Sequence, residues 1–141
     1  MSRTRKPQFP RSVVRLFSAL GQPARLRILL AIGKGEACVC HLEAALGQRQ
    51  AYISQNLMAL RKEGIVVPRR EGRNIYYRLK DTALLDLIRH AALLAGIPEN
   101  EVIIVPPNEL VPDCCCPYCE TALHDVASHS PETVQLTVSQ M

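Results

Sequence analysis

Two consecutive helical segments separated by a glycine constrain the fold of this 141-residue chain more than any other feature. The first runs from Glu36 to Leu46 with its apolar residues at helical spacing, and Gly47 ends it. The second begins at about Arg49 or Gln50 and carries an apolar stripe at positions i, i+4 and i+7: Ile53, Leu57 and Leu60. Two helices joined by so short a turn predict a helix-turn-helix.

Two strand-like runs follow these helices, at 65–70 and 74–79, and Gly72 between them can adopt a positive φ. Seven Lys or Arg residues and two acidic residues lie between Arg61 and Lys80, a local excess of +5. These runs predict a basic hairpin, or wing. A hairpin that only covers a core is the alternative, but such a hairpin does not need arginines at three of the five positions from Arg69 to Arg73.

Three further segments have the apolar spacing of helices. Ser12 to Leu20 and Pro23 to Gly33 are predicted to be scaffold helices. Asp81 to Ala95 has more apolar residues than a single contact face requires, which suggests a dimer interface. The expected fold is therefore mainly α with a small β-hairpin, a dimeric winged helix-turn-helix.

Charge divides the chain into a basic body and an acidic tail. All 17 Lys and Arg residues lie between Arg3 and Arg89, and with six acidic residues they give positions 1–96 a net charge of +11. Positions 97–141 have seven acidic residues and no Lys or Arg, a net charge of −7. We expect a basic N-terminal arm over 1–10, a DNA-binding and dimerisation domain over 11–96, and an acidic, proline-rich tail with a cysteine cluster over 97–141.

The expected partner is double-stranded DNA, read by the helix that begins near Gln50. Such a helix fits the major groove, whereas arginines at a hairpin tip reach phosphates or the minor groove. A dimer would place two reading helices about one DNA turn, ~34 Å, apart and would favour a palindromic operator. The candidate DNA contacts are Arg49, Gln50, Tyr52, Ser54 and Gln55 in or beside this helix, and Arg69, Arg70 and Arg73 in the wing.

No apolar run approaches the ~20 residues that span a bilayer, so we expect a cytoplasmic location and no membrane partner. In a reducing compartment the six cysteines are expected to be ligands or reactive thiols rather than structural disulfides. The sequence has no arrangement of nucleophile and base that suggests an enzyme.

Cys38 and Cys40 lie directly ahead of the predicted reading helix. Thiolates prefer soft ions, and a helix N-terminus favours the thiolate form. Residues at i and i+2 point apart on a regular helix, so both sulfurs bind one ion only if the helix start distorts or the ion lies at its end. The missing ligands are expected to come from the tail, from the same or the partner subunit, although a separate tail site is an alternative. The tail thiols are Cys114, Cys115, Cys116 and Cys119, the last two with CxxC spacing.

Four segments carry a resemblance to a known family: Leu20–Leu30, Glu36–Glu43, Gln50–Lys62 and Glu71–Leu79. With the helices between and after them they cover about residues 10 to 96, and together they resemble the ArsR/SmtB family of winged-helix repressors. The resemblance implies a dimer that binds its operator without ligand, is released by a metal or metalloid, and has no catalytic activity. The Cys-Val-Cys pair resembles the site of the family's arsenic and cadmium/lead sensors.

The chain also departs from the family's patterns. Arsenic sensors add a third Cys where this chain has Glu43, and cadmium sensors take thiols from an N-terminal extension, but no Cys precedes Cys38. A second family site uses Asp and His ligands on the terminal helix. Asp81 matches its first position, whereas Ala83 and Leu94 stand where histidines would be expected. We therefore expect that site to be absent and Asp81 to cap a helix.

The sequence thus predicts a transcriptional repressor released from its operator by a soft ion bound to Cys38, Cys40 and tail cysteines. Four thiolates suit Cd(II), Pb(II) or Zn(II), which are slightly favoured, and three suit As(III) or Sb(III). His41 is a neighbouring ligand candidate, although a solvent-facing or capping role is expected. The alternatives are a repressor that senses oxidants or reactive sulfur through these thiols, and a zinc-stabilised interaction module without DNA function.

Overall fold

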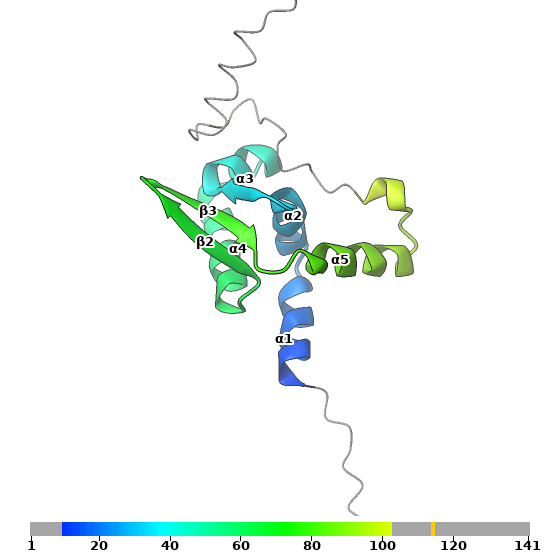
Figure 1. Ribbon diagram of the computed structural model, residues 1–141. Coiled ribbons are helices and arrows are strands. Elements are labelled where there is room, and N and C mark those ends of the chain that lie inside the picture. The colour runs from blue at the N-terminus through cyan, green and yellow to red at the C-terminus, as the bar shows by residue number, and fades with distance from the viewer. Residues whose placement is uncertain (1–9, 103–113, 115–141) are drawn as a thin grey trace, which may run out of the picture.

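The computed structural model describes residues 10–102 and Cys114, and Figure 1 shows the arrangement of their helices and strands. The elements, in chain order, are α1 (Arg11–Leu20), α2 (Pro23–Ile32), β1 (Glu36–Cys38), α3 (Val39–Leu46), α4 (Gln50–Lys62), β2 (Val66–Glu71), β3 (Asn74–Leu79), α5 (Ala83–Leu94) and the 3₁₀ turn η1 (Glu99–Glu101). This is the predicted winged helix-turn-helix, mainly helical with a small sheet.

Helix α2 lies at the centre of the core and packs against α1, α3, α4 and α5. Its side chains Ile28, Leu29 and Ile32 are fully buried. They meet the buried apolar residues of the helix-turn-helix, which are Leu42 of α3 and Ile53, Leu57 and Leu60 of α4. Each such side chain stabilises the fold by about 1.5–3 kcal/mol relative to an exposed position. The stripe predicted for α4 is therefore confirmed as the face that fixes its orientation.

The turn between α3 and α4 depends on Gly47, which has a left-handed backbone with φ 62°. L-residues with a Cβ rarely adopt this conformation, although the space around the glycine is open. The predicted helix end at this residue is confirmed, and α4 begins three residues later at Gln50.

The sheet has three antiparallel strands in the order β1-β3-β2. The predicted hairpin is confirmed as β2 and β3, joined through Gly72 with φ 59°. The prediction of a single helix over 36–46 is wrong at its start, because residues 36–38 form strand β1 and the helix begins at Val39. These residues pair with β3, with Glu36 opposite Arg78 and Cys38 opposite Tyr76, so their backbone groups are bonded in a ladder instead of a helix end.

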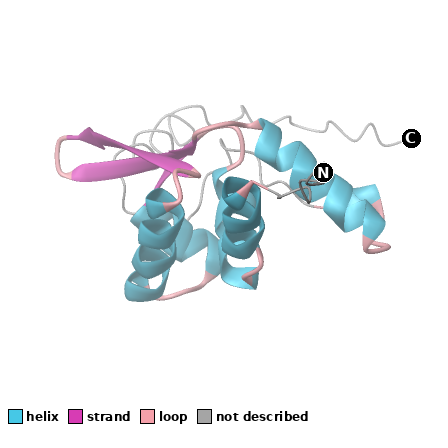
Figure 2. Ribbon diagram, turned by 90° about the horizontal axis from the view of Figure 1, so that it is seen from below, coloured by secondary structure: helices cyan, strands magenta, loops and turns pink. Residues whose placement is uncertain are grey.

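The β2–β3 wing and α5 lie at opposite ends of the molecule, as two perpendicular views show (Figures 1 and 2). Helix α5 is shorter than predicted at both ends, and the Asp81 carboxylate accepts the backbone N–H of Ala83 at 2.9 Å. The N-cap residue is Thr82, which makes no side-chain capping bond, so Asp81 satisfies a donor of the first turn from one residue before the cap position predicted for it. Among the described residues, no helix combines the length and the apolar character that crossing a bilayer requires.

Candidate metal centre and nucleic-acid interface

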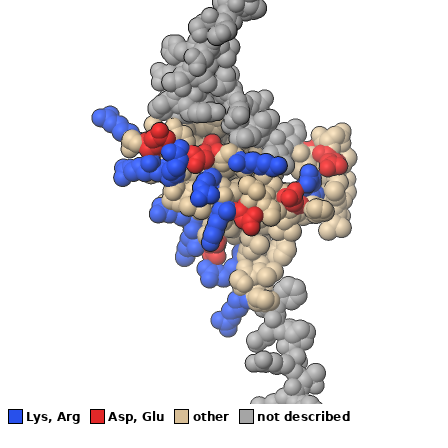
Figure 3. All heavy atoms as spheres, in the orientation of Figure 1, with Lys and Arg blue, Asp and Glu red and all other residues tan. Residues whose placement is uncertain are grey.

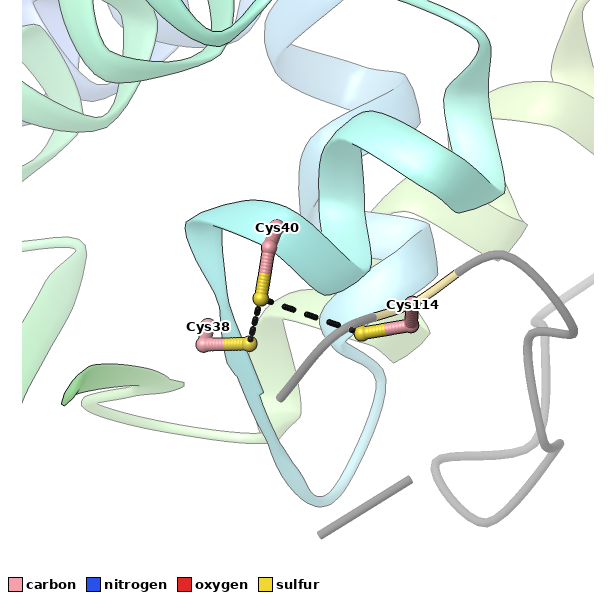
Figure 4. Close-up of side chains that lie close together, drawn as sticks. All are labelled: Cys38, Cys40 and Cys114. Atoms are coloured by element: carbon pink, nitrogen blue, oxygen red, sulfur yellow. Dashed lines mark hydrogen bonds between the residues drawn. The ribbon is translucent and has the colours of Figure 1, made fainter. Parts of the chain in front are cut away.

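Three thiols converge where β1 meets α3 (Figure 4). The Sγ atoms of Cys38 and Cys40 are 3.0 Å apart, and those of Cys40 and Cys114 are 3.8 Å apart. All three sulfur atoms lie within 4.8 Å of one another. Cys38 and Cys114 are buried and Cys40 is half-buried. A residue of the tail therefore joins the Cys-Val-Cys pair of its own chain across 74 positions of sequence.

Side chains at i and i+2 diverge on a regular helix, but Cys38 and Cys40 lie on either side of the junction between strand β1 and helix α3. Cys38 is the last residue of β1, with an extended backbone at φ −85° and ψ 168°, whereas Cys40 lies in the first turn of α3. Because the backbone changes direction between them, their sulfur atoms point toward each other instead of diverging. The expected distortion of the helix start thus takes the form of a strand that ends at its N-cap.

Cys38 is also the N-cap of α3. Its Sγ accepts the backbone N–H of His41 at 3.4 Å, a weak contact of the kind that satisfies the first turn of a helix. An amide donor and the positive end of the helix dipole both favour the thiolate over the thiol. The site therefore favours the protonation state that soft ions bind.

The three sulfur positions are close enough to share a single ion. Zn–S bonds of ~2.3 Å place tetrahedral sulfur ligands ~3.8 Å apart. The Cys40–Cys114 separation has this value, and the Cys38–Cys40 separation of 3.0 Å has to widen by less than 1 Å. Within the described part of the chain, this is the one group of at least three Cys, His, Asp or Glu side chains close enough to share an ion.

His41 is buried, so the expectation of a solvent-facing side chain is wrong. It lies next to Leu42 on the side of α3 that packs inward, and burial lowers the pKa of its imidazole. Its backbone N–H donates to the Sγ of Cys38, the N-cap residue of this helix.

The remaining tail cysteines, Cys115, Cys116 and Cys119, lie outside the described residues. Their roles as ligands therefore stay predictions. The expected absence of the terminal-helix site stays a prediction; Asp81 accepts the backbone N–H of Ala83, and Ala83 and Leu94 have no side-chain ligand atom.

The side chains predicted to contact DNA are distributed over α4 and the wing. Gln50, Tyr52 and Gln55 are exposed on α4, Ser54 is half-buried, and Arg49 is the exposed N-cap residue of the helix. Arg70 and Arg73 are exposed in the wing. Lys and Arg side chains gather on the face that Figure 3 shows, over the wing and the neighbouring helices, and are sparser toward the end that carries α5.

Arg69 differs from the other predicted DNA contacts because its guanidinium is held by carboxylates. It makes ion pairs of 2.7 Å with both Glu36 and Glu71. Hydrogen bonding lowers the pKa of Glu36 and raises that of Arg69. This ion pair was not predicted from the sequence, since Glu36 and Arg69 lie on strands that are not adjacent in the sheet. The one sequence signal was the alternation of side chains between the two faces of the strand at 74–79. This alternation places Tyr76 and Arg78 on the face opposite Tyr77.

The chain is similar to known bacterial regulatory proteins. The family model described as "Bacterial regulatory protein, arsR family" matches residues 22–67. The chain is 43% identical over 76 residues to a transcriptional repressor SmtB homolog of Synechocystis, covering 54% of this chain and 58% of that protein. It is 42% identical over 67 residues to the arsenical resistance operon repressor of Escherichia coli, covering 47% of this chain and 57% of that protein.

Among solved structures, the homodimeric winged helix-turn-helix domain of a possible ArsR-family regulator from Mycobacterium bovis is similar to this chain, with a TM-score of 0.55. The sequences are 32% identical, and the match covers 65% of this chain and 91% of that domain. The two curated repressors are matched over a little more than half of their length. The chain therefore spans only part of the length of those two proteins.

Proposed function

This chain belongs to the ArsR family of bacterial regulatory proteins, and on that basis we propose that it is a dimeric repressor that loses operator affinity when a thiophilic ion binds. The ligands are Cys38, Cys40 and Cys114. The observation that carries the proposal is the convergence of these three sulfur atoms at the N-cap of the helix that precedes α4.

DNA binding rests on the exposed amides of α4 and on the exposed wing. Gln50 and Gln55 can each form paired hydrogen bonds with an adenine edge in the major groove. Arg70 and Arg73 supply charge to phosphates or the minor groove. An α4 that is anchored on three fully buried side chains presents these amides in a fixed direction.

A homodimer is supported by apolar surface at the end of the molecule opposite the wing. Phe17 of α1, Leu93 and Leu94 of α5, and Ile97 beyond it are exposed. An apolar groove between α1, α2 and α5 includes Phe17, Leu30, Leu87 and Ile97 in its lining. Exposed apolar surface of this kind indicates a protein interface, and the solved relative is homodimeric. The pairing of two such faces would present both reading helices to one duplex.

Ion binding acts at the start of α3. An ion draws the three sulfur atoms into one coordination shell, which changes the Cys38–Cys40 separation and the N-cap contact with His41. Because α3 is joined to α4 through the three residues 47–49, a displacement of its N-terminal turn reaches the reading helix through a short connection. By linkage, a conformation that favours the ion and disfavours DNA makes the two ligands antagonists.

The number of sulfur ligands decides the class of ion. Three thiolates suit As(III) or Sb(III), whereas a fourth sulfur from Cys115, Cys116 or Cys119 makes a tetrahedral shell for Cd(II), Pb(II) or Zn(II). Ultraviolet absorption of the sulfur-to-metal charge transfer, recorded with Cd(II) and with As(III), tests the proposal. We expect intense bands in the full chain and their loss when Cys38 and Cys40 are both replaced by serine. Unchanged bands in that variant would overturn the assignment.

A second candidate function follows from the 3.0 Å separation of the Cys38 and Cys40 sulfur atoms. An oxidant such as a peroxide could accept two electrons from these thiols, which would release two protons and form a disulfide. Thiol counting after peroxide treatment, in parallel with operator binding, separates the two mechanisms. A redox sensor releases DNA upon oxidation without an ion, whereas a metal sensor releases it under reducing conditions when the ion is added.

A further inference from the structure

A row of side chains crosses the sheet from the thiol site to the wing. Cys38 of β1 is paired with Tyr76 of β3, and Tyr76 is paired with Arg69 of β2. Successive residues of a strand point to opposite faces, so these three directly opposed residues share one face of the sheet. Tyr76 packs against the cluster formed by the thiols, and the Arg69 guanidinium lies 5.0 Å from the centre of its ring.

Arg69 also reaches past β3 to the strand that carries the thiol. Its Nε donates to both carboxylate oxygens of Glu36 at 3.0 Å, and its Nη2 donates to one of them at 2.7 Å. Its Nη1 donates to Glu71 at 2.7 Å. Glu36 is two residues before Cys38 and therefore on the same face of β1. One wing side chain thus contacts both strands that lie beside the thiol site.

We propose that the Arg69–Glu36 pair is the positioning link that transmits occupancy of the thiol site to the wing. The inference rests on the proposed function. Ion binding at Cys38 moves the end of β1, and the paired contacts of Arg69 with Glu36 and Tyr76 transfer that movement to β2. This strand also carries Arg70 and leads to Arg73 at the turn. Arg69 therefore orients the arginines that meet DNA, and is not itself a phosphate contact.

The geometry distinguishes Arg69 from its neighbours. All three of its guanidinium nitrogens donate to carboxylates, so three of its five N–H groups are already bonded and the two carboxylates beside it repel a phosphate. Arg70 follows it on β2 and points to the other face, and no ion pair joins it to any residue within 10–102. Arg78, directly opposite Glu36, adds a positive charge near that carboxylate. An isolated exposed ion pair contributes little to stability, but a multidentate Arg–carboxylate contact fixes orientation, which is the property that a link requires.

The test compares Arg69→Met with the matched control Arg70→Met in the full chain. The DNA is a duplex selected from a random library by the wild-type protein, and the ion is Cd(II). Operator affinity is measured by fluorescence anisotropy with and without Cd(II). The response is defined as the ratio of these two operator affinities. Cd(II) affinity is measured separately from thiolate absorption. Glu36→Gln, which keeps the shape of the side chain, serves as a second and milder variant.

We expect Arg69→Met to reduce the response by a factor of at least about five, which is the lower end of the usual coupling between two binding sites. The Cd(II) affinity of the free protein should stay unchanged. Glu36→Gln should reduce the response in the same direction, and the double variant should lose no more than Arg69→Met alone, because both changes break one link. Arg70→Met should weaken DNA binding equally with and without Cd(II), and so leave the response intact.

Two results would overturn the link. A wild-type response in Arg69→Met, with weaker DNA binding and a smaller salt dependence, would make Arg69 an ordinary phosphate contact. Equal loss of response in Arg69→Met and Arg70→Met would show that only wing charge matters. If the wild-type protein binds DNA but shows no response to Cd(II), As(III) or Zn(II), the proposed function itself fails. The proposed link between the thiol site and the wing then fails with it.

Discussion

Cys38 and Tyr76 face each other across the β1–β3 ladder, which places a candidate ion ligand in direct register with a strand of the wing. Cys38 is at the same time the N-cap of α3. One residue therefore adjoins both the helix-turn-helix, at the start of α3, and the wing, through its pairing with β3. A change in the position of its sulfur reaches both through bonded neighbours.

The contribution of the tail is tested by Cys114→Ser. Losing one of three sulfur ligands should weaken Cd(II) binding by more than about tenfold, since changes outside the ligand shell already cost 10–100-fold. Charge-transfer absorption and chelator competition measure the effect. A chain truncated after Pro112 is the matched comparison, because it lacks all four tail thiols. Equal Cd(II) affinity in Cys114→Ser and the full chain would remove Cys114 from the site.

The two groups of DNA contacts should respond differently to substitution. Gln55→Ala on α4 should cost about 1–3 kcal/mol on the selected duplex and little on random DNA, because a base-edge contact carries sequence information. Arg73→Ala should weaken both duplexes equally and reduce the salt slope by about one. Anisotropy titrations at several salt concentrations provide both quantities. If Gln50→Ala and Arg73→Ala leave DNA affinity unaffected, the alternative of an interaction module gains support.

The sequence predicted the elements that depend on local patterns and missed those that depend on distant partners. The stripe of Ile53, Leu57 and Leu60 fixed the orientation of α4 because helical spacing alone defines a face. Strand β1 was missed, since three residues become a strand only by pairing with β3, some 40 positions later. Cys114 was expected to meet Cys38 and Cys40, but only the fold shows that it does so within one chain.

The dimer is tested at Leu94, which is 91% exposed at the end of α5. Leu94→Glu places a charge in the proposed apolar interface, where its desolvation is unfavourable, and should shift the protein toward monomer. Sedimentation velocity over a range of concentrations measures this shift. Ile75→Glu, a change at an exposed apolar residue of the wing, is the control and should leave the oligomeric state unchanged. A Leu94→Glu variant that sediments as wild type would exclude this surface.

Stability of the ion-free protein should fall in mild acid because of His41. Burial lowers the pKa of this imidazole below its ordinary value of 6.5, so the unfolded state binds a proton that the folded state resists. The contribution of neutral His41 to the free energy of unfolding is complete above pH 6.5 and is lost as the pH falls through the lower pKa of the folded state. Urea unfolding between pH 5 and pH 8, with a chelator present, should therefore show a free energy of unfolding that rises with pH. In His41→Leu this rise should be smaller, and an identical pH profile in the two proteins would contradict the assignment.

Antagonistic binding of ion and operator is measured most directly by the Cd(II) affinity of the protein alone and of the protein saturated with operator. Linkage requires that DNA weaken Cd(II) binding by the same factor by which Cd(II) weakens DNA binding. Chelator competition gives both Cd(II) affinities, and anisotropy gives the two DNA affinities. We predict two equal factors of at least about fivefold in the wild type, and neither effect when Cys38 and Cys40 are serine. Equal Cd(II) affinity in free and operator-bound protein would contradict this prediction.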